Sequence, residues 1–246
     1  YLGGISGLLD DLFDDTSKET QSLKDFISSP KEMKPQTDHE ALLLNLYSKG
    51  LKESSRPEKI KQEALKVFQS QQESLRQKDN SISISELEKI TIAKGGSSFL
   101  YYRACLENPA DENEEKLLYH LGGLMQLGND IFDVYKDHQE NIHTLATKTT
   151  DIEDLRRYFQ QELNKTFELA EACSYSPKNI GKFLKIISLG IARVYVCLDQ
   201  FRELQHNNKG KFEVEKYHRK ELICDMQKPG NQLKAIQYYF KIISRH

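Results

Sequence analysis

Cysteine is scarce in this chain of 246 residues, and the positions of the four cysteines exclude two common uses of the residue. Cys105, Cys173, Cys197 and Cys224 lie far apart, and no Cys-x-x-Cys pair occurs. Zinc ribbons need closely spaced thiol pairs, and small secreted domains need a dense disulfide framework. We therefore expect reduced thiols, most of them buried.

Neither charge of one sign nor hydrophobicity is concentrated in the sequence. Lys and Arg (35) nearly balance Asp and Glu (37), whereas nucleic-acid binding needs a basic footprint. The longest apolar stretch, 186–198, is too short to cross a bilayer and contains Arg193. We expect a cytoplasmic protein without a transmembrane segment or a nucleic-acid partner, and a homodimer stays open.

Strand-like alternation and glycine-rich nucleotide motifs are also missing. Neither Gly-x-Gly-x-x-Gly nor Gly-x-x-x-x-Gly-Lys-Ser/Thr occurs, which disfavours Rossmann and P-loop proteins. Apolar residues recur with helical period, so we predict one all-α domain over residues 1–246. Because the sequence opens at Tyr1 inside an apolar segment, we expect this domain to lack its N-terminal helices. The predicted helices cover residues 3–16, 38–50, 57–78, 85–106, 114–140, 151–172, 177–205 and 232–245, with a polar loop after the first.

Two dense acidic clusters lie within these predicted helices. The first is Asp10-Asp11-Leu12-Phe13-Asp14-Asp15, and in the second Gln126, Asn129, Asp130, Asp133 and Asp137 fall within an arc of about 120°. Carboxylates three or four residues apart repel by about 0.2–0.5 kcal/mol per pair, and only Lys136 offsets this. Hard divalent cations take oxygen ligands, so the clusters predict a metal site between two facing helices. The alternative is a pair of solvated polar faces.

A third feature is the segment Lys94-Gly95-Gly96-Ser97-Ser98 inside the predicted helix 85–106. Each glycine costs about 1 kcal/mol relative to alanine, so the pair predicts either a helix break or a close approach by another segment. Glycine used only for packing, with the lysine in solvent, is the alternative. The same helix opens with Ser85-Glu86-Leu87-Glu88, a capping-box pattern.

These segments resemble the class I isoprenoid synthases, the all-α family of terpene cyclases and prenyltransferases. Asp10-Asp11-Leu12-Phe13-Asp14 matches the family's first motif, Asp-Asp-x-x-Asp. Of the cyclase motif Asn-Asp-Ile-x-Ser-x-x-Lys-Glu the chain keeps Asn129, Asp130, Ile131 and Lys136, with Asp133 for serine and Asp137 for glutamate. Of the prenyltransferase pattern Gly-x-x-Phe-Gln-x-x-Asp-Asp-x-x-Asp it keeps Gly122, Gln126, Asp130 and Asp133.

The resemblance implies an antiparallel helical bundle of the isoprenoid synthase type, with a central active-site cavity. It implies that three Mg²⁺ ions bind the diphosphate of a prenyl substrate between the two motifs. It assigns the metals to Asp10, Asp11, Asp14, Asn129, Asp130, Asp133 and Asp137, of which Asp10, Asp14 and Asp133 are the catalytic candidates. It assigns substrate contacts to Lys94, Lys136, Gln126 and Arg103.

Departures from the family patterns reduce the number of reactions that the resemblance allows. Residues 16–20 read Thr-Ser-Lys-Glu-Thr where chain-elongating prenyltransferases carry an arginine pair, so elongation is disfavoured. Residues 82–85 read Ile-Ser-Ile-Ser where cyclases place a diphosphate-sensing arginine, and no C-terminal Arg-Tyr pair is evident. The lead-in Ser6-Gly7-Leu8-Leu9-Asp10 is similar to that of atypical bacterial terpene synthases. We therefore expect a divergent terpene synthase, a lyase acting on one prenyl diphosphate; head-to-head condensation of the squalene or phytoene type, or a non-catalytic homologue, are the alternatives.

Overall fold

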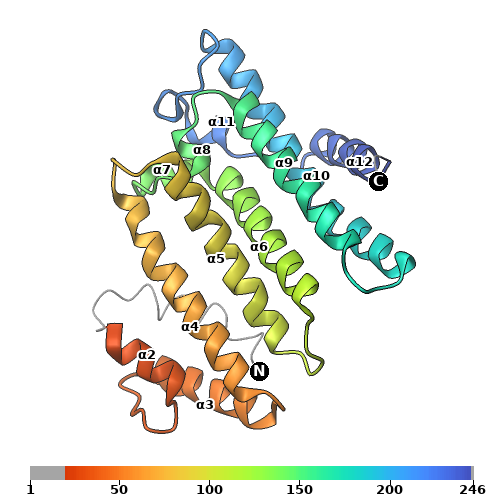
Figure 1. Ribbon diagram of the computed structural model, residues 1–246. Coiled ribbons are helices and arrows are strands. Elements are labelled where there is room, and N and C mark those ends of the chain that lie inside the picture. Colours follow the sequence, from red (N-terminus) through yellow and green to blue (C-terminus); the bar gives the residue numbers. More distant parts are fainter. Residues whose placement is uncertain (1–19, 245–246) are drawn as a thin grey trace.

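The computed structural model describes residues 20–244, and within this range the regular elements are all helices (Figure 1). The all-α prediction is therefore confirmed for the described part of the chain. The α-helices are α2 (Thr20–Ser28), α3 (Asp38–Glu53), α4 (Pro57–Ser74), α5 (Ile84–Ala104), α6 (Glu112–Phe132), α7 (Val134–Gln139), α8 (Leu145–Lys148), α9 (Ile152–Glu171), α10 (Pro177–Asn207), α11 (Arg219–Leu222) and α12 (Pro229–Ile243). Two short 3₁₀ helices, η2 (Leu75–Lys78) and η3 (Val214–Lys216), complete them.

Beyond shifts of a few residues at the helix ends, the structure differs from the sequence prediction at α2, at the start of α5, at the end of α4 and between α6 and α7. The segment expected to be a polar loop contains α2, because Leu23, Phe26 and Ile27 are buried and give it one apolar side. The capping box at the start of α5 is formed by Ser83 and Glu86, two residues before the predicted pair. The helix expected over 57–78 ends as the 3₁₀ turn η2. The helix expected over 114–140 is divided into α6 and α7 at Asp133.

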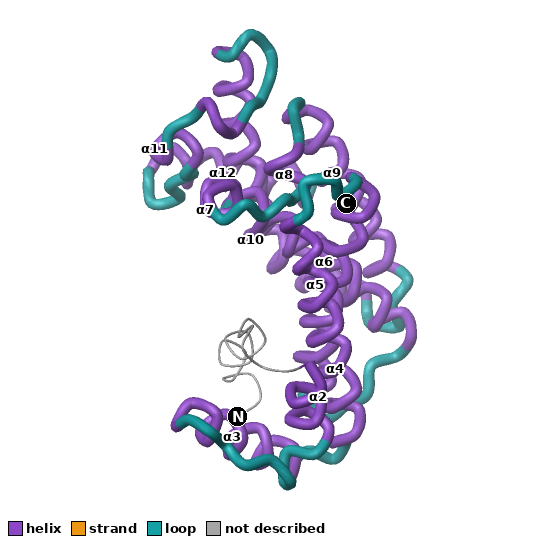
Figure 2. The backbone as a smooth tube through the Cα atoms, turned by 90° about the vertical axis from the view of Figure 1, so that its left-hand side faces the viewer, coloured by secondary structure: helices purple, strands orange, loops and turns teal. Residues whose placement is uncertain are grey.

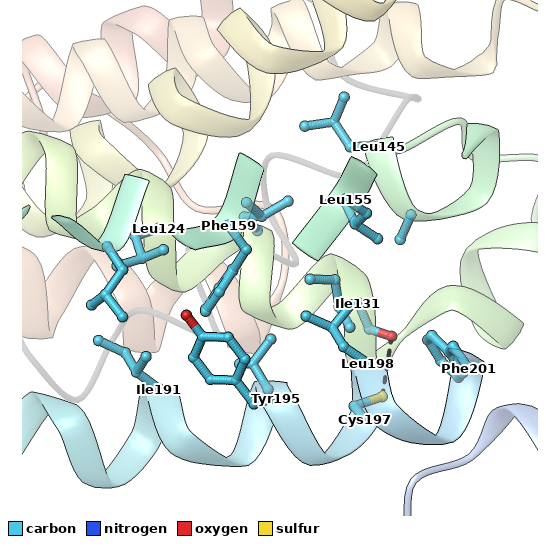
Figure 3. Close-up of a cluster of buried hydrophobic side chains, with 14 of the residues drawn as sticks. Leu124, Ile131, Leu145, Leu155, Phe159, Ile191, Tyr195, Cys197, Leu198 and Phe201 are labelled. Carbon is cyan, nitrogen blue, oxygen red and sulfur yellow. Dashed lines mark hydrogen bonds between the residues drawn. The ribbon is translucent and has the colours of Figure 1, made fainter. Parts of the chain in front are cut away.

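The long helices follow one another along a curve, as the view in Figure 2 shows. α5 packs against both α4 and α6, and α6 packs in turn against α9 and α10. The larger hydrophobic core fills the space among α6, α9 and α10, where Leu124, Phe159 and Ile191 point toward one another (Figure 3). A smaller core joins α2, α3 and α4 to Tyr101 and Ala104 near the end of α5.

The contact between α5 and α6 is unusually close because glycines meet at the crossing. A Cβ atom at Gly95 would lie 2.0 Å from the carbonyl oxygen of Gly122, and one at Gly122 would lie 2.3 Å from the carbonyl oxygen of Gly95. α5 is nevertheless continuous from Ile84 to Ala104, so the predicted helix break is wrong and the predicted close approach is confirmed. The hydroxyl of Ser98 donates to the carbonyl of Lys94 at 2.9 Å within this segment.

The C-terminal helix α12 is attached to α9 and α10 through a polar cluster. The guanidinium of Arg156 lies over the rings of Tyr195 and Tyr238, 5.1 and 5.5 Å from their centroids. It donates to Asp199 at 2.9 Å and to the Tyr238 hydroxyl at 2.8 Å, and that hydroxyl donates to Asp199 at 2.7 Å. Each charge is therefore paired, as partly buried ions require.

Replacing Gly95 or Gly122 with alanine is expected to destabilise the protein by about 3 kcal/mol, because the added methyl group must push α5 and α6 apart. Urea denaturation followed by circular dichroism measures this. Gly181→Ala on α10 is the matched control: apart from the adjoining residues and backbone of its own helix, no atom lies within 4 Å of its added Cβ. Helix propensity should therefore make this variant equally or more stable, by up to about 1 kcal/mol. Equal effects at all three glycines would contradict the assigned role of the crossing.

Candidate functional site

The polar residues of the second acidic cluster lie at the junction of α6 and α7. Asp133 stands between the two helices, with backbone angles φ −92° and ψ 9°. Its amide donates to the Asn129 carbonyl at 2.8 Å, and its own carbonyl accepts from the Asp137 amide at 2.9 Å. These two bonds keep the helical register across the junction. Asn129, Asp133 and Asp137 therefore follow one another along one side, as the four-residue spacing predicts.

The side chains of this cluster differ in exposure. Asn129, Asp133 and Lys136 are exposed, and Asp137 is half-buried. Asp130 is only 6% exposed and lies behind them, facing α5. One of its oxygens accepts from the Gln126 amide at 2.8 Å, and the other accepts from the Thr91 hydroxyl at 3.2 Å. Asp130 is thus held in place by the helix contact that the glycines permit.

The carboxylates of the cluster are close enough to affect one another. Burial raises the pKa of Asp130 to about 6, and the nearby Asp133 adds to the rise, against the hydrogen bonds from Gln126 and Thr91 and the charge of Lys94. Burial, with the charges of Asp130 and Asp133, raises the pKa of Asp137 to about 7, against Lys136 and Lys94. A cation placed among these groups would relieve the repulsion between them.

The two lysines predicted to contact substrate are placed beside the cluster. Lys94 comes from α5 and acts on Asp130 and Asp137, which lie on the α6 and α7 side. Lys136 belongs to the exposed side of α7. Both cations lower the pKa of Asp137, so each lies within electrostatic reach of the cluster and offsets part of its negative charge. The cluster therefore has donors for a cation and for an anion.

Arg103 and Gln126, also predicted to contact substrate, are engaged by the protein itself. Arg103 lies nine residues after Lys94, about 14 Å further along α5 by helical rise. Its guanidinium binds Glu114 at 2.6 and 3.2 Å and the Asn108 carbonyl at 2.5 Å. Gln126 uses its amide group on Asp130. For both residues the substrate contact stays a prediction.

The first acidic motif, with Asp10, Asp11 and Asp14, lies outside the described residues. Within residues 20–244, no three carboxylate, imidazole or thiol groups come close enough together to hold a metal ion by themselves. The α6–α7 cluster offers Asn129 and Asp133 as exposed oxygen donors, with Asp137 beside them. These donors fit part of the coordination shell of a hard cation, which also takes oxygens from water and phosphate.

A largely apolar pocket lies beside Asn129. It has a volume of about 250 Å³ and lies between α6 and α10. Its apolar walls come from Leu124, Met125, Phe132, Phe159, Ile191 and Val194. Asn129 and Arg193, both exposed residues, also line it.

Arg193 is the residue that sequence reasoning overlooked as a site candidate. It is the one cation inside the longest apolar stretch, and this position is the sequence feature that could have marked it as a site candidate. Arg103 and Arg156 are bound to carboxylates, whereas Arg193 forms no ion pair with any residue of the range 20–244. The fold brings Arg193 to the same pocket as Asn129, although 64 residues separate the two in the sequence.

Comparison of the chain with models of protein families, with curated proteins and with solved structures gave no match.

The pKa shifts predict how stability depends on pH. Because the native Asp130 and Asp137 hold protons more tightly than in the unfolded chain, the free energy of unfolding in metal-free buffer should fall as pH rises from about 4 to about 7. Asp130→Asn keeps the shape of the side chain and removes its charge. It should flatten this slope and stabilise the protein near pH 8 by on the order of 2 kcal/mol.

Urea denaturation at several pH values checks this expectation. Glu107→Gln is the control, because Glu107 is an exposed carboxylate near the opposite end of α5, outside the cluster. It should leave the slope unchanged. An Asp130→Asn protein with the same slope as the wild type would show that the cluster does not strain the fold.

Proposed function

We propose that the protein is a Mg²⁺-dependent class I terpene synthase, with one isoprenoid synthase domain over residues 1–246. In this proposal it ionises a prenyl diphosphate and cyclises or quenches the cation, releasing diphosphate. The observation that carries the proposal is the α6–α7 cluster, where mutually repelling carboxylates lie beside two lysines. Such a combination suits a diphosphate substrate bound together with metal ions, because the carboxylates can bind the metal ions and the lysines can bind the phosphate oxygens. The match of Asp10, Asp11 and Asp14 to the first family motif supports it.

In the proposed site, each residue has a role that follows from its exposure. Asn129, Asp133 and Asp137 supply oxygens for Mg²⁺ on one side of the diphosphate, and the first motif supplies them on the other. Asp130 lies behind and fixes the junction through Gln126 and Thr91. When bound, three Mg²⁺ ions would neutralise the charge that develops on the departing diphosphate.

The residues around the metals have to bind the diphosphate and exclude water. Lys94 and Lys136 are proposed to bind phosphate oxygens beside the carboxylates. Arg193 is proposed to bind them from α10, in place of the sensor arginine that residues 82–85 lack. The apolar pocket next to it would hold part of the hydrocarbon chain. Its ring faces, Phe132 and Phe159, can stabilise a nearby cation while keeping water away.

Product analysis distinguishes the proposed function from three alternatives. Purified protein is incubated with Mg²⁺ and prenyl diphosphates of about ten to twenty-five carbons, singly and with isopentenyl diphosphate, and extracts are analysed by mass spectrometry. A hydrocarbon or alcohol from a single substrate supports the proposal. A longer diphosphate formed only with isopentenyl diphosphate indicates elongation. Coupling of two identical substrates indicates a squalene-type enzyme, and a lack of any product favours a non-catalytic homologue.

Removing one metal ligand should abolish turnover and leave the fold intact. Asp133→Asn and Asp10→Asn are each expected to lower product formation about a hundredfold or more, because the charge on the departing diphosphate loses its counterions. Added Mg²⁺ should raise the melting temperature of the wild type near pH 8 and leave that of Asp133→Asn unchanged. Glu107→Gln should respond like the wild type. Full activity in both aspartate variants would remove the metal-site assignment.

Arg193→Ala tests the proposed arginine separately. Loss of a charge-assisted contact to phosphate should lower kcat/KM about tenfold to a hundredfold, and Arg193→Lys should restore part of it. The melting temperature should change little, because Arg193 is exposed. Lys182→Ala removes another exposed cation of α10 outside the pocket and should leave kcat/KM unchanged. Equal losses in the two alanine variants would indicate a general charge effect.

A further inference from the structure

The outer side of α12 is a row of exposed apolar side chains. Leu233, Ile236 and Phe240 are 62%, 51% and 60% exposed, and their spacing of three and four residues places them on one side of the helix. The opposite side is covered, because Tyr238 stacks on Tyr195 at 5.1 Å and Ile242 is buried. α12 is thus apolar on both sides, and a helix of this kind is normally enclosed on both.

The charge of the same segment indicates what encloses it. From Met226 to His246 the sequence has no Asp or Glu, although the whole chain has 37 of them. Lys228, Lys234 and Lys241 are all exposed in this segment. Lys234 has only a distant carboxylate partner, Glu203, at 3.9 Å. Within α12 itself the row is therefore flanked by lysines and by no carboxylate, so its partner should be apolar and anionic.

A second copy of α12 does not meet this requirement. Two such helices packed along their apolar rows would bring lysines near lysines, and neither helix has a carboxylate to pair with them. An anionic lipid surface meets both requirements, because it offers acyl chains to the apolar row and phosphate or carboxylate headgroups to the lysines. At 15 residues α12 is too short to cross a bilayer, and no helix of residues 20–244 is long and apolar enough to do so.

We propose that α12 docks the protein on the surface of an anionic membrane. Leu233, Ile236 and Phe240 enter the outer part of the acyl layer, while Lys228, Lys234 and Lys241 lie among the headgroups. The helix lies in the plane of the interface and keeps its inner side on α10. This inference does not depend on the proposed enzymatic function.

Vesicle flotation with the full chain tests the proposal. Vesicles of phosphatidylcholine with about 30% phosphatidylserine should bind the protein, and vesicles of phosphatidylcholine alone should bind it at least tenfold more weakly. Raising the salt concentration should release it, because the lysine contacts are screened. Equal binding to both vesicle types, or none to either, would overturn the proposal.

Two triple variants separate the contributions of the apolar row and of the lysines to vesicle binding. Replacing Leu233, Ile236 and Phe240 with serine, or Lys228, Lys234 and Lys241 with glutamine, should each reduce binding about a hundredfold. The matched control replaces Ile186 and Leu189 of α10 with serine, since these are 68% and 57% exposed and lie on another helix. The control should bind as the wild type does. Unchanged vesicle binding of either α12 variant would contradict the proposal. A stable wild-type dimer that the serine variant fails to form would also contradict it, because the apolar row would then be the contact between two copies.

The chain has no tryptophan, so Phe240→Trp creates a single reporter at the proposed contact. Its emission should shift to shorter wavelength on anionic vesicles and be quenched by brominated lipid tails. Ile186→Trp is the matched probe outside the contact and should show neither change. Quenching of both probes alike would place the membrane elsewhere on the molecule.

Discussion

The close crossing of α5 and α6 at Gly95 and Gly122 is the constraint on which the site depends. Without side chains at these positions, the two backbones come near enough for the Thr91 hydroxyl to reach Asp130 at 3.2 Å. That contact fixes the buried carboxylate, and Lys94 approaches the cluster from the same helix. The backbone packing at the glycines therefore helps to position the buried carboxylate whose charge raises the pKa of Asp137.

The carboxylates oppose folding and at the same time provide the chemistry that we propose. Burial and mutual repulsion raise the pKa of Asp130 and Asp137, so the protein holds these charges at some cost in stability. The larger core among α6, α9 and α10 compensates for this cost on the other side of α6. Perturbed acidic groups of this kind concentrate at functional sites, because function selects charges that stability alone would remove.

Much of the fold could be predicted from the sequence, because the long helices have strong apolar periodicity and clear start signals such as Pro57 and Pro177. α2 was missed because its three buried residues stand in a short polar segment, where only tertiary contact with α3 and α4 stabilises a helix. The grouping of Asn129, Asp133 and Asp137 followed from helical spacing. Arg193 could not be placed, because its approach to Asn129 depends on how α10 packs on α6, which no local pattern encodes.

The polar cluster of Arg156, Asp199 and Tyr238 makes the fold sensitive to truncation of α12. The Tyr238 hydroxyl accepts from Arg156 and donates to Asp199, so it completes a closed ring of hydrogen bonds between α9, α10 and α12. A chain shortened before this tyrosine would lack one of the two rings beside the Arg156 guanidinium and the hydroxyl that accepts its hydrogen bond. The C-terminal helix is therefore an integral part of the folded unit, and peptide tags are better accommodated after it than in its place.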